Sequence, residues 1–273
     1  MDSVFCLKHR GSLEYFEIEF PCPGIARGIF TTRKGGVSLP PFNSLNMAFH
    51  VGDEKEKVLL NRKIAADALG IPLEEFTSGE QVHGDKVVLV EEEQRGRGAF
   101  DLKDVIPGAD ALITGKKNVA LTAFFADCVP IYILCPHDRK IGIAHAGWKG
   151  TALGIAGKTV KAMKAAFGVK ERDCMAFIGP SIGPCCYTVG ENVYMQFSDH
   201  FENKRDDFFK KLSHEKWSLD LWTANKYDLI FSGIEPKNIF VSGLCTCCNE
   251  NLFFSYRREN GKTGRMAAVF KLI

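Results

Sequence analysis

The apolar positions of the chain fall mostly into short runs divided by polar turns, a pattern typical of strands in a packed core. Two runs in the middle of the chain, residues 121–125 and 129–134, are rich in aromatic and β-branched side chains, which favours buried strands. A polar turn at 136–140 follows, and residues 141–144 return to the core. We expect the last two strands to form a hairpin that brings Cys128 close to His145.

The remaining elements follow from the same periodicities. Further strands are predicted at residues 15–20, 25–31, 87–90, 105–114, 175–179 and 239–242, with a terminal hairpin of 253–258 and 266–273. Helices are predicted over 53–69, with Asp53 as N-cap and Gly70 as the stop, from 149–151 to about 167, and over most of 193–230. Arg62 is expected on a helix surface. No repeat or linker interrupts the pattern, so we expect one α/β domain over residues 1–273.

Composition narrows the class of protein. With 35 basic and 33 acidic side chains the net charge is +2, which gives no electrostatic reason to expect a nucleic acid or a membrane as partner. No apolar run approaches the roughly 20 residues that span a bilayer, and the N-terminus lacks a signal-peptide pattern, so a cytoplasmic protein is expected. In that compartment the ten cysteines are expected to act as thiols, ligands or nucleophiles rather than as a disulfide framework.

Cys128 and His145 are the first candidates for chemistry. A thiol in an apolar strand is usually a small core residue, and a histidine at a strand end is usually one too. Here Asp127 precedes the thiol and a glycine follows the histidine closely, and both are costly in a plain core strand. His83, directly before Gly84, repeats this pattern of a histidine with a small residue close by.

Two chemistries remain open for these residues. Cys128 could act as a nucleophile with His145 as its base. Alternatively, both residues join His83 around a metal, because two nitrogens and one sulfur suit Zn²⁺ or copper and leave a fourth position free, as in catalytic zinc sites. The ligand count favours the metal.

Another polar segment follows the strand at 25–31. The pair Gly35 and Gly36 stands beside two cations and could present backbone N–H groups to an anion such as phosphate, although such a pair is most often only a turn. Arg33 is the favoured contact, because a guanidinium can grip phosphate or a purine edge through two hydrogen bonds. The irregular loop 40–49 adds Asn46 and other polar side chains.

Five cysteines form a separate group at positions 185, 186, 245, 247 and 248. Cys245 and Cys248 have C-x-x-C spacing, and Cys185 with Cys186 could complete a thiolate site. A zinc ribbon normally contains two C-x-x-C pairs, whereas the first pair here is adjacent. A packed thiol cluster or a redox-sensitive disulfide is therefore favoured over structural zinc.

Eight motifs follow one another in order through nearly the whole chain: GIFTTRKGGVS, SLN, QVHG, ADALIT, ADCVP, AHAGWKGT, IGPCCY and FFSYRRENGKTGR. Together they resemble the YfiH/YlmD family, also called laccase-domain or multicopper polyphenol oxidoreductase-like proteins. The resemblance implies a single α/β domain, a layered α/β/β/α sandwich with mixed sheets. By motif it implies His83, Cys128 and His145 as zinc ligands, Arg33 as a contact to phosphate or substrate, and Asn46 as a pocket residue.

The activity that the resemblance implies is phosphorolysis of purine nucleosides at a zinc site. The substrates would be adenosine, inosine, guanosine and S-methyl-5′-thioadenosine, each split by phosphate into a base and ribose 1-phosphate or methylthioribose 1-phosphate, and adenosine would also be deaminated to inosine. Asp127 is our candidate proton shuttle. Copper could occupy the same ligands in vitro. Small-molecule purine nucleosides and phosphate are the expected partners, and the chain is expected to be a monomer or a small homo-oligomer.

Two other activities stay open. One is a metal-free cysteine hydrolase or deamidase that uses Cys128 and His145. The other is a copper-dependent polyphenol oxidase, for which seven histidines are few. Loss of activity on chelation would separate the metal enzymes from the thiol enzyme.

Overall fold

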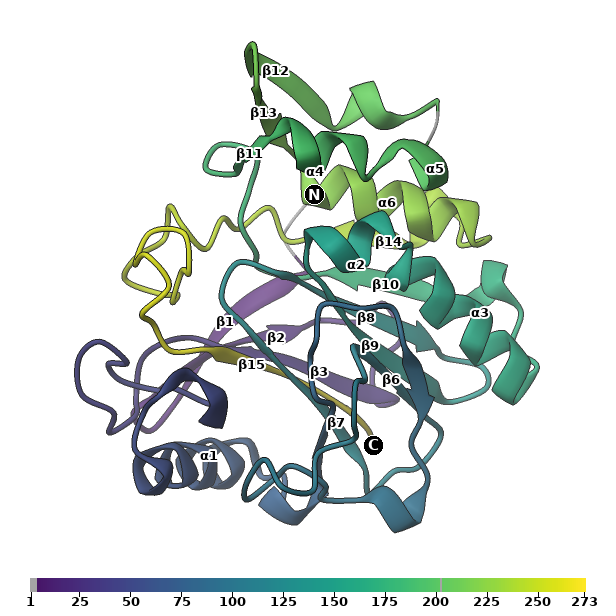
Figure 1. Cartoon of the computed structure of the whole chain (residues 1–273). Coiled ribbons are helices and arrows are strands. Elements are labelled where there is room, and N and C mark those ends of the chain that lie inside the picture. The colour runs from purple at the N-terminus through teal and green to yellow at the C-terminus, as the bar shows by residue number, and fades with distance from the viewer. Residues whose placement is uncertain (1–3, 202) are drawn as a thin grey trace.

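Two stacked six-stranded sheets form the centre of the structure, a computed structural model that describes residues 4–201 and 203–273 (Figure 1). The first sheet consists, in spatial order, of β1 (Phe5–Arg10), β2 (Leu13–Ile18), β3 (Ala26–Thr31), β15 (Met266–Leu272), β7 (Ala120–Phe125) and β4 (Phe76–Ser78). The second consists of β14 (Ile239–Val241), β10 (Met175–Ile178), β8 (Val129–Cys135), β9 (Lys140–Ala146), β6 (Ala111–Thr114) and β5 (Val87–Leu89). Both sheets combine parallel with antiparallel pairs, so both are mixed.

Helices cover the outer faces of both sheets. The α-helices of the described residues are α1 (Lys55–Leu69), α2 (Trp148–Ala152), α3 (Ile155–Phe167), α4 (Glu191–Met195), α5 (Ser198–Phe201) and α6 (Leu221–Phe231). α1 packs on the first sheet, and α3 and α6 pack on the second (Figure 1). A small third sheet of β11 (Thr188–Gly190), β13 (Lys216–Leu219) and β12 (Phe209–Ser213) lies beside α4. The expected layered α/β/β/α sandwich with mixed sheets is confirmed.

Alternation along the strands explains the layers. On β15, Phe270 faces the interior between the two sheets and its neighbour Val269 faces α1. Tyr132 of β8 also points between the sheets, where its hydroxyl group donates a hydrogen bond of 2.7 Å to the carbonyl oxygen of Ile29 in β3. Because the central strands are covered on both faces, their sequences read as nearly continuous apolar runs.

The chain crosses from the first sheet to the second at residues 126–128, between β7 and β8. Asp127 lies at this corner with a φ of 88°, a left-handed conformation that lets the chain turn sharply. β8 and β9 then form the predicted hairpin, in which Pro130 is paired with His145. The interruption that the sequence predicts between the two apolar runs is therefore the place where the strands change sheets.

Two expectations about the C-terminal half are wrong. Residues 209–219, expected in a helix, form the β12–β13 hairpin, and Trp217 of β13 stacks on Tyr194 with ring centroids 3.9 Å apart. The alternation Lys-Trp-Ser-Leu in β13 has the period of a strand. The terminal hairpin is also absent from the described residues: 253–258 form no strand, and β15 pairs with β3 and β7 instead.

The start of the first helix also differs from the prediction. α1 begins at Lys55, with Glu54 at the N-cap position, whereas Asp53 was expected there. The Asp53 carboxylate instead accepts hydrogen bonds from the side chains of Ser38 and Asn46. These bonds stabilise the conformation of the 38–53 segment. Gly70 ends the helix as predicted, with a left-handed φ of 64°.

Cys135, at the end of β8, and Cys174, just before β10, form a disulfide bond. The expectation that the cysteines act as thiols is wrong for these two residues, which face each other across the neighbouring strands β8 and β10. Cys128 takes part in no disulfide bond.

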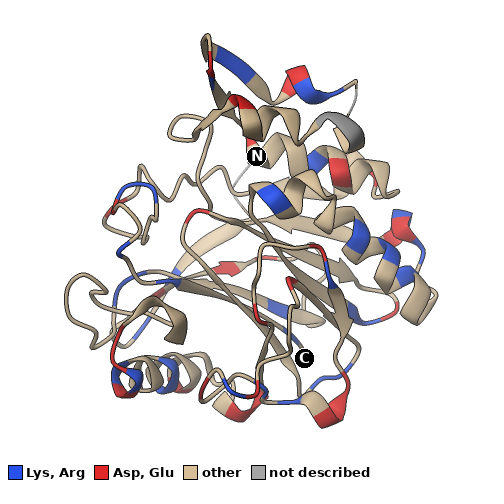
Figure 2. Ribbon diagram, in the orientation of Figure 1, with Lys and Arg blue, Asp and Glu red and all other residues tan. Residues whose placement is uncertain are grey.

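Charged residues of both signs are spread over helices, strands and loops (Figure 2). On α3, for example, the lysines point outward while Val160 and Met163 pack on the sheet. Within the described ranges, no helix combines the length and the apolarity needed to cross a bilayer.

Arg62 of α1 is buried, which contradicts its expected surface position. Its guanidinium group donates hydrogen bonds to the carbonyl oxygens of Met47, Gly98 and Ala99 and lies between the rings of Phe49 and Phe124. It thus satisfies three loop carbonyls inside the core. Helical spacing could not reveal this, because the acceptors are backbone atoms of distant loops.

We expect Arg62→Ala to lower the free energy of unfolding by about 3 kcal/mol or more, because buried carbonyl groups would lose their donors. Urea unfolding measures the effect. Lys63→Ala, at the exposed neighbouring position, serves as control and should stay within about 0.5 kcal/mol of the parent protein. Equal midpoints for the two variants would contradict this role of Arg62.

Candidate active site

His83, Cys128 and His145 converge at one end of the second sheet. Their ligand atoms all lie within 4.8 Å of one another, and the two imidazole rings meet at 72° with centroids 4.8 Å apart. Cys128 stands directly before β8, His145 is the next-to-last residue of β9, and His83 lies on the loop from β4 to β5. His145 is buried, Cys128 is half-buried and His83 is exposed, so the group opens toward one side.

A buried carboxylate, Asp110, holds two of these three residues in place. It accepts hydrogen bonds from the backbone N–H groups of Val82, His83 and Gly84, at 3.2, 3.0 and 2.7 Å, and lies 2.9 Å from Nδ1 of His145. The three N–H groups converge because His83 has a left-handed φ of 61°. With Nδ1 of His145 engaged by Asp110, Nε2 is the nitrogen left for a metal or for Cys128.

Asp110 was not among the site residues that the sequence indicated. It stands directly before the apolar strand β6, and an acid at the entrance of a buried strand was the available signal. The register of the sheet explains its reach. Ala111 pairs with Ala144, so Asp110 and His145 become neighbours, and the His145 N–H group donates to the Asp110 carbonyl oxygen at 2.8 Å.

Gly147 makes the close approach of the three side chains possible. A Cβ atom at this position would lie 2.9 Å from the Cys128 sulfur and 3.0 Å from Cδ2 of His83. Real Cβ atoms do not come so close to neighbouring heavy atoms, so a larger residue would push the candidate ligands apart. The glycine after His145 therefore serves the site.

The electrostatics of the group favour a thiolate. Burial by itself would raise the pKa of Cys128, but the charge and hydrogen bonds of His145 and His83 outweigh it and lower this pKa to about 6. Burial acts to lower the pKa of His145, but Cys128 and Asp110 raise it above its usual value. Burial likewise opposes ionisation of Asp110, but the His145 contact and the backbone N–H groups lower the pKa of its carboxyl group. Without metal, the site is therefore a thiolate beside an imidazolium.

The three residues lie in a cavity of about 530 Å³. Phe124, Trp148, Tyr187 and Tyr256 contribute aromatic rings to its lining. The cavity also contains the cationic side chains of Lys149, Arg257 and Arg265, and His50 and Gln81 add polar groups. Sequence patterns did not point to these cations, because Lys149 belongs to α2 whereas Arg257 and Arg265 lie between β14 and β15, and only the fold brings the two parts together.

Asp127 lines the same cavity, and its carboxylate already has three donors. One oxygen accepts a hydrogen bond of 2.7 Å from the Thr246 hydroxyl group. The other accepts hydrogen bonds from the Ser255 hydroxyl group at 3.1 Å and from the Arg257 N–H group at 2.7 Å. Asp127 thus anchors the segment between β14 and β15, and its role as a proton shuttle stays a prediction.

Arg33 lies outside this cavity, in a second cleft of about 420 Å³. Its guanidinium group contacts a Glu259 carboxylate oxygen at 2.7 Å and lies over the Phe254 ring. Gly35 and Gly36 line neither cavity, and a Cβ at either position would meet backbone oxygen at 2.4 Å. These glycines allow close backbone packing, and the predicted phosphate contacts of Arg33, Gly35 and Gly36 stay predictions.

Asn46 is buried and acts on the cavity through another residue. Its side-chain oxygen accepts a hydrogen bond of 3.0 Å from the backbone N–H group of Arg265, which does line the cavity. The Asn46 amide group also donates to Asp53 at 2.9 Å. Asn46 therefore positions Arg265, whereas direct contact of Asn46 with a substrate stays a prediction.

We expect Asp110→Asn to weaken zinc binding about 10- to 100-fold, because the anchor of His145 and of the His83 loop would lose its charge. Titration of metal-free protein against a zinc-binding dye measures the affinity. Asp85→Asn, on the same loop but paired with Lys158 at the surface, is the matched control. An affinity unchanged by Asp110→Asn would contradict the anchoring role.

The lowered pKa of Cys128 predicts how its alkylation depends on pH. In metal-free protein, reaction of Cys128 with iodoacetamide should rise through pH of about 6, since the thiolate is the reactive form and is present above the pKa. Cys22, whose pKa burial raises, is an internal control that should react only at alkaline pH. Peptide mass spectrometry follows both sites. Parallel profiles for the two cysteines would contradict the thiolate–imidazolium pair.

Known proteins resemble this chain over most of its length. The family model described as multi-copper polyphenol oxidoreductase laccase matches residues 27–273. The chain is 43% identical over 248 residues to purine nucleoside phosphorylase YlmD of Geobacillus stearothermophilus, covering 91% of this chain and 90% of the relative. It is 40% identical to purine nucleoside phosphorylase YlmD of Bacillus subtilis, covering 87% and 85% of the two chains.

A solved structure extends the likeness to three dimensions. The crystal structure of YlmD from Geobacillus stearothermophilus matches with a TM-score of 0.95 at 40% sequence identity, covering 99% of both chains. The family match, the relatives and the fold all agree with the motifs that the sequence carries. The chain therefore belongs to the multi-copper polyphenol oxidoreductase laccase family, the group that contains YfiH and YlmD.

Proposed function

We propose that the protein is a zinc-dependent purine nucleoside phosphorylase. The observation that carries the proposal is the convergence of His83, Cys128 and His145 in a cavity that also holds cations and aromatic rings. Relatives that share about two fifths of the sequence over most of its length are named purine nucleoside phosphorylases. The substrates are adenosine, inosine, guanosine and S-methyl-5′-thioadenosine, together with phosphate.

The cavity suits a nucleoside and an anion. Its volume of about 530 Å³ falls within the range typical of small-molecule sites. Aromatic side chains of its lining, among them Tyr256 and Trp148, can stack on a purine face. Arg257 and Arg265 offer guanidinium groups that can bind phosphate through paired hydrogen bonds. Both arginines line the cavity that contains His83, Cys128 and His145, whereas Arg33 lies in another cleft and contacts Glu259.

The three candidate ligands fit zinc by their chemistry. Two imidazole nitrogens and a thiolate are donors that zinc prefers, and three protein ligands leave a position for a reacting molecule. The contact of Asp110 with Nδ1 of His145 is the outer carboxylate that metal-bound histidines commonly have. When bound, zinc would supply a Lewis acid and lower the pKa of water toward about 7.

In phosphorolysis, an oxygen of phosphate forms a bond to C1′ of the ribose while the bond from C1′ to the purine nitrogen breaks. The electron pair of that bond goes to the purine, which takes up a proton. The sugar becomes cationic as the base leaves, so an anion held beneath it by Arg257 and Arg265 stabilises the transition state. Stacking against the aromatic lining fixes the leaving base in line with the attack.

We propose adenosine deamination as a further reaction of the same cavity. Water adds to C6 of the purine and ammonia leaves, which requires one group to move a proton to the departing nitrogen. Asp127, which lines the cavity, is the candidate for this transfer. Its three hydrogen-bond donors fix its position and make it a rigid acceptor.

The second candidate function is a metal-free cysteine hydrolase, and one observation favours it. Cys128, His145 and Asp110 form a linked series in which the acid contacts one nitrogen of the imidazole and the thiol lies on the other side. This is the arrangement of an activated nucleophile with its base and an orienting acid. In that case the protein would act without metal.

Product analysis of inosine with phosphate tests the proposal. We expect hypoxanthine and ribose 1-phosphate from the zinc-loaded protein, and a loss of kcat/KM of at least about 100-fold in Cys128→Ala, because a ligand is removed. Arg265→Gln should raise the KM for phosphate about 10-fold or more through loss of a charged hydrogen bond. Cys22→Ala, which changes a cysteine outside the cavity, is the matched control.

Chelation distinguishes the two candidates. A zinc phosphorylase loses its turnover when the metal is removed and regains it when zinc is restored. Full phosphorolysis by Cys128→Ala would contradict the proposal. Hydrolysis that persists after chelation but disappears in Cys128→Ala would establish the thiol enzyme instead.

A further inference from the structure

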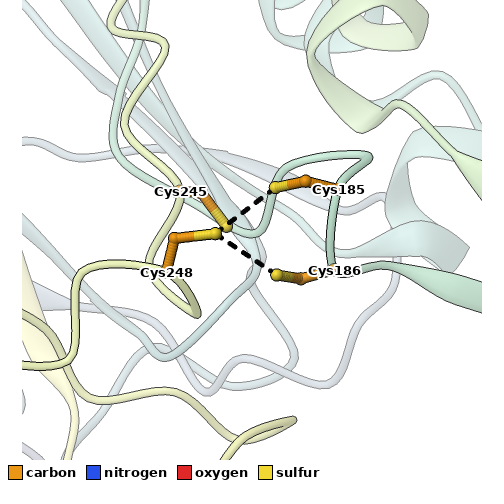
Figure 3. A group of neighbouring side chains, drawn as sticks. All are labelled: Cys185, Cys186, Cys245 and Cys248. Atoms are coloured by element: carbon orange, nitrogen blue, oxygen red, sulfur yellow. Dashed lines mark hydrogen bonds between the residues drawn. The ribbon is translucent and has the colours of Figure 1, made fainter.

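A second set of sulfur atoms converges outside the cavity. The four-cysteine cluster consists of Cys185, Cys186, Cys245 and Cys248. The first two lie on the loop between β10 and β11, and the other two lie on the loop after β14. Figure 3 shows the four side chains pointing toward one another from these two loops. Their sulfur atoms lie within 4.8 Å of one another, with Cys248 at 3.5 Å from Cys185 and 3.4 Å from Cys186.

These distances suit a metal better than a disulfide. Zinc–sulfur bonds of about 2.3 Å in a tetrahedron place the sulfur atoms about 3.8 Å apart. A disulfide requires about 2.05 Å between two sulfur atoms and leaves two of the four cysteines unpaired. In the cluster, Cys248 is at a similar distance from both sulfurs of the adjacent pair, as a shared central ion would require.

The surroundings of the cluster match those of bound thiolates. The backbone N–H group of Gly183 donates to the Cys245 sulfur at 3.3 Å, the kind of hydrogen bond that stabilises a negatively charged sulfur. Cys245 is buried, whereas Cys185 and Cys248 are exposed, so an ion can enter from solvent. The adjacent pair departs from the two-knuckle spacing of zinc ribbons because both cysteines project from one tight loop.

We propose that the four-cysteine cluster binds a structural zinc ion, separate from the site formed by His83, Cys128 and His145. Four thiolates fill all the positions of a tetrahedral ion, which leaves none for a substrate. The ion closes two loops that are about 60 residues apart in the sequence, since Cys186 and Cys248 are separated by 62 positions. Its role is therefore to hold structure.

The two loops that the ion joins form part of the cavity wall. The first loop supplies Ile182 and Tyr187 to the cavity. On the second loop, Thr246 donates its hydroxyl hydrogen bond to Asp127. Arg257, on the segment after β14, reaches the first loop: its guanidinium group lies over the Tyr187 ring and donates a hydrogen bond of 3.4 Å to the Cys186 carbonyl oxygen. A structural ion here would fix the wall against which the substrate binds.

Metal stoichiometry tests this proposal. Reduced protein is stripped of metal, reloaded with zinc chloride, desalted and measured by elemental mass spectrometry. We expect about two zinc ions per wild-type chain, about one in the double variant Cys185→Ser with Cys248→Ser, and about one in His83→Ala. Combining all three substitutions should remove both ions. Cys247→Ser, at the neighbour of Cys248 outside the cluster, is the control that keeps the wild-type content.

Cobalt provides a second measurement that does not depend on nucleoside turnover. In His83→Ala loaded with cobalt(II), four thiolates should give intense sulfur-to-cobalt charge-transfer absorption, and the double cysteine variant should lack it. Zinc content unchanged by the double cysteine substitution would overturn the proposal. A His83→Ala protein that binds no zinc after reloading would also overturn it, and this outcome does not depend on whether the cysteine variant folds. A disulfide bond within the cluster after reloading would overturn the proposal as well.

Discussion

The geometry of the site depends on the buried carboxylate of Asp110. Burying a carboxylate away from water costs free energy unless hydrogen bonds replace its hydration. For Asp110, three backbone N–H groups and an imidazole provide these hydrogen bonds. These donors come from two segments far apart in the sequence, the 82–84 loop and strand β9. Satisfying one charge therefore forces His83 and His145 to lie beside each other.

The third member of the group is placed by the way the two sheets are connected. The chain leaves the first sheet after β7 and enters the second at β8, and Cys128 stands at the end of this corner. A second buried carboxylate, Asp127, fixes the corner by accepting hydrogen bonds from Thr246, Ser255 and Arg257. Two carboxylates thus hold the cavity, Asp110 on the side of the histidines and Asp127 on the side of the C-terminal loops.

The sequence predicted the parts of this structure that depend on local patterns. Apolar periodicity identified the hairpin that pairs Pro130 with His145, and motif resemblance identified the layered fold. It failed where distant backbone decides the outcome, as for Arg62, whose partners are carbonyl oxygens of two loops. It also misjudged 209–219, where aromatic residues compatible with either period form a hairpin that packs on Tyr194.

For the candidate site, the sequence pointed to the three candidate metal ligands but not to the residues around them. His83, Cys128 and His145 were recognisable without coordinates, because their side chains can bind a metal and an acidic residue or a glycine stands close to each in the sequence. Asp110 was not, because an acid before a strand acquires meaning only when the register places it beside His145. The cations of the cavity were missed for the same reason. Arg33, which the sequence favoured as a phosphate contact, is paired with Glu259 in another cleft.

Anomalous diffraction from crystals of the zinc-loaded protein tests whether His83, Cys128 and His145 hold the metal. Data collected on either side of the zinc absorption edge locate the ion without assumptions about activity. We expect an anomalous peak within about 2.3 Å of the Cys128 sulfur and about 2.1 Å of one ring nitrogen of each of His83 and His145. Absence of a peak between these three residues, in crystals that bind zinc elsewhere, would contradict it.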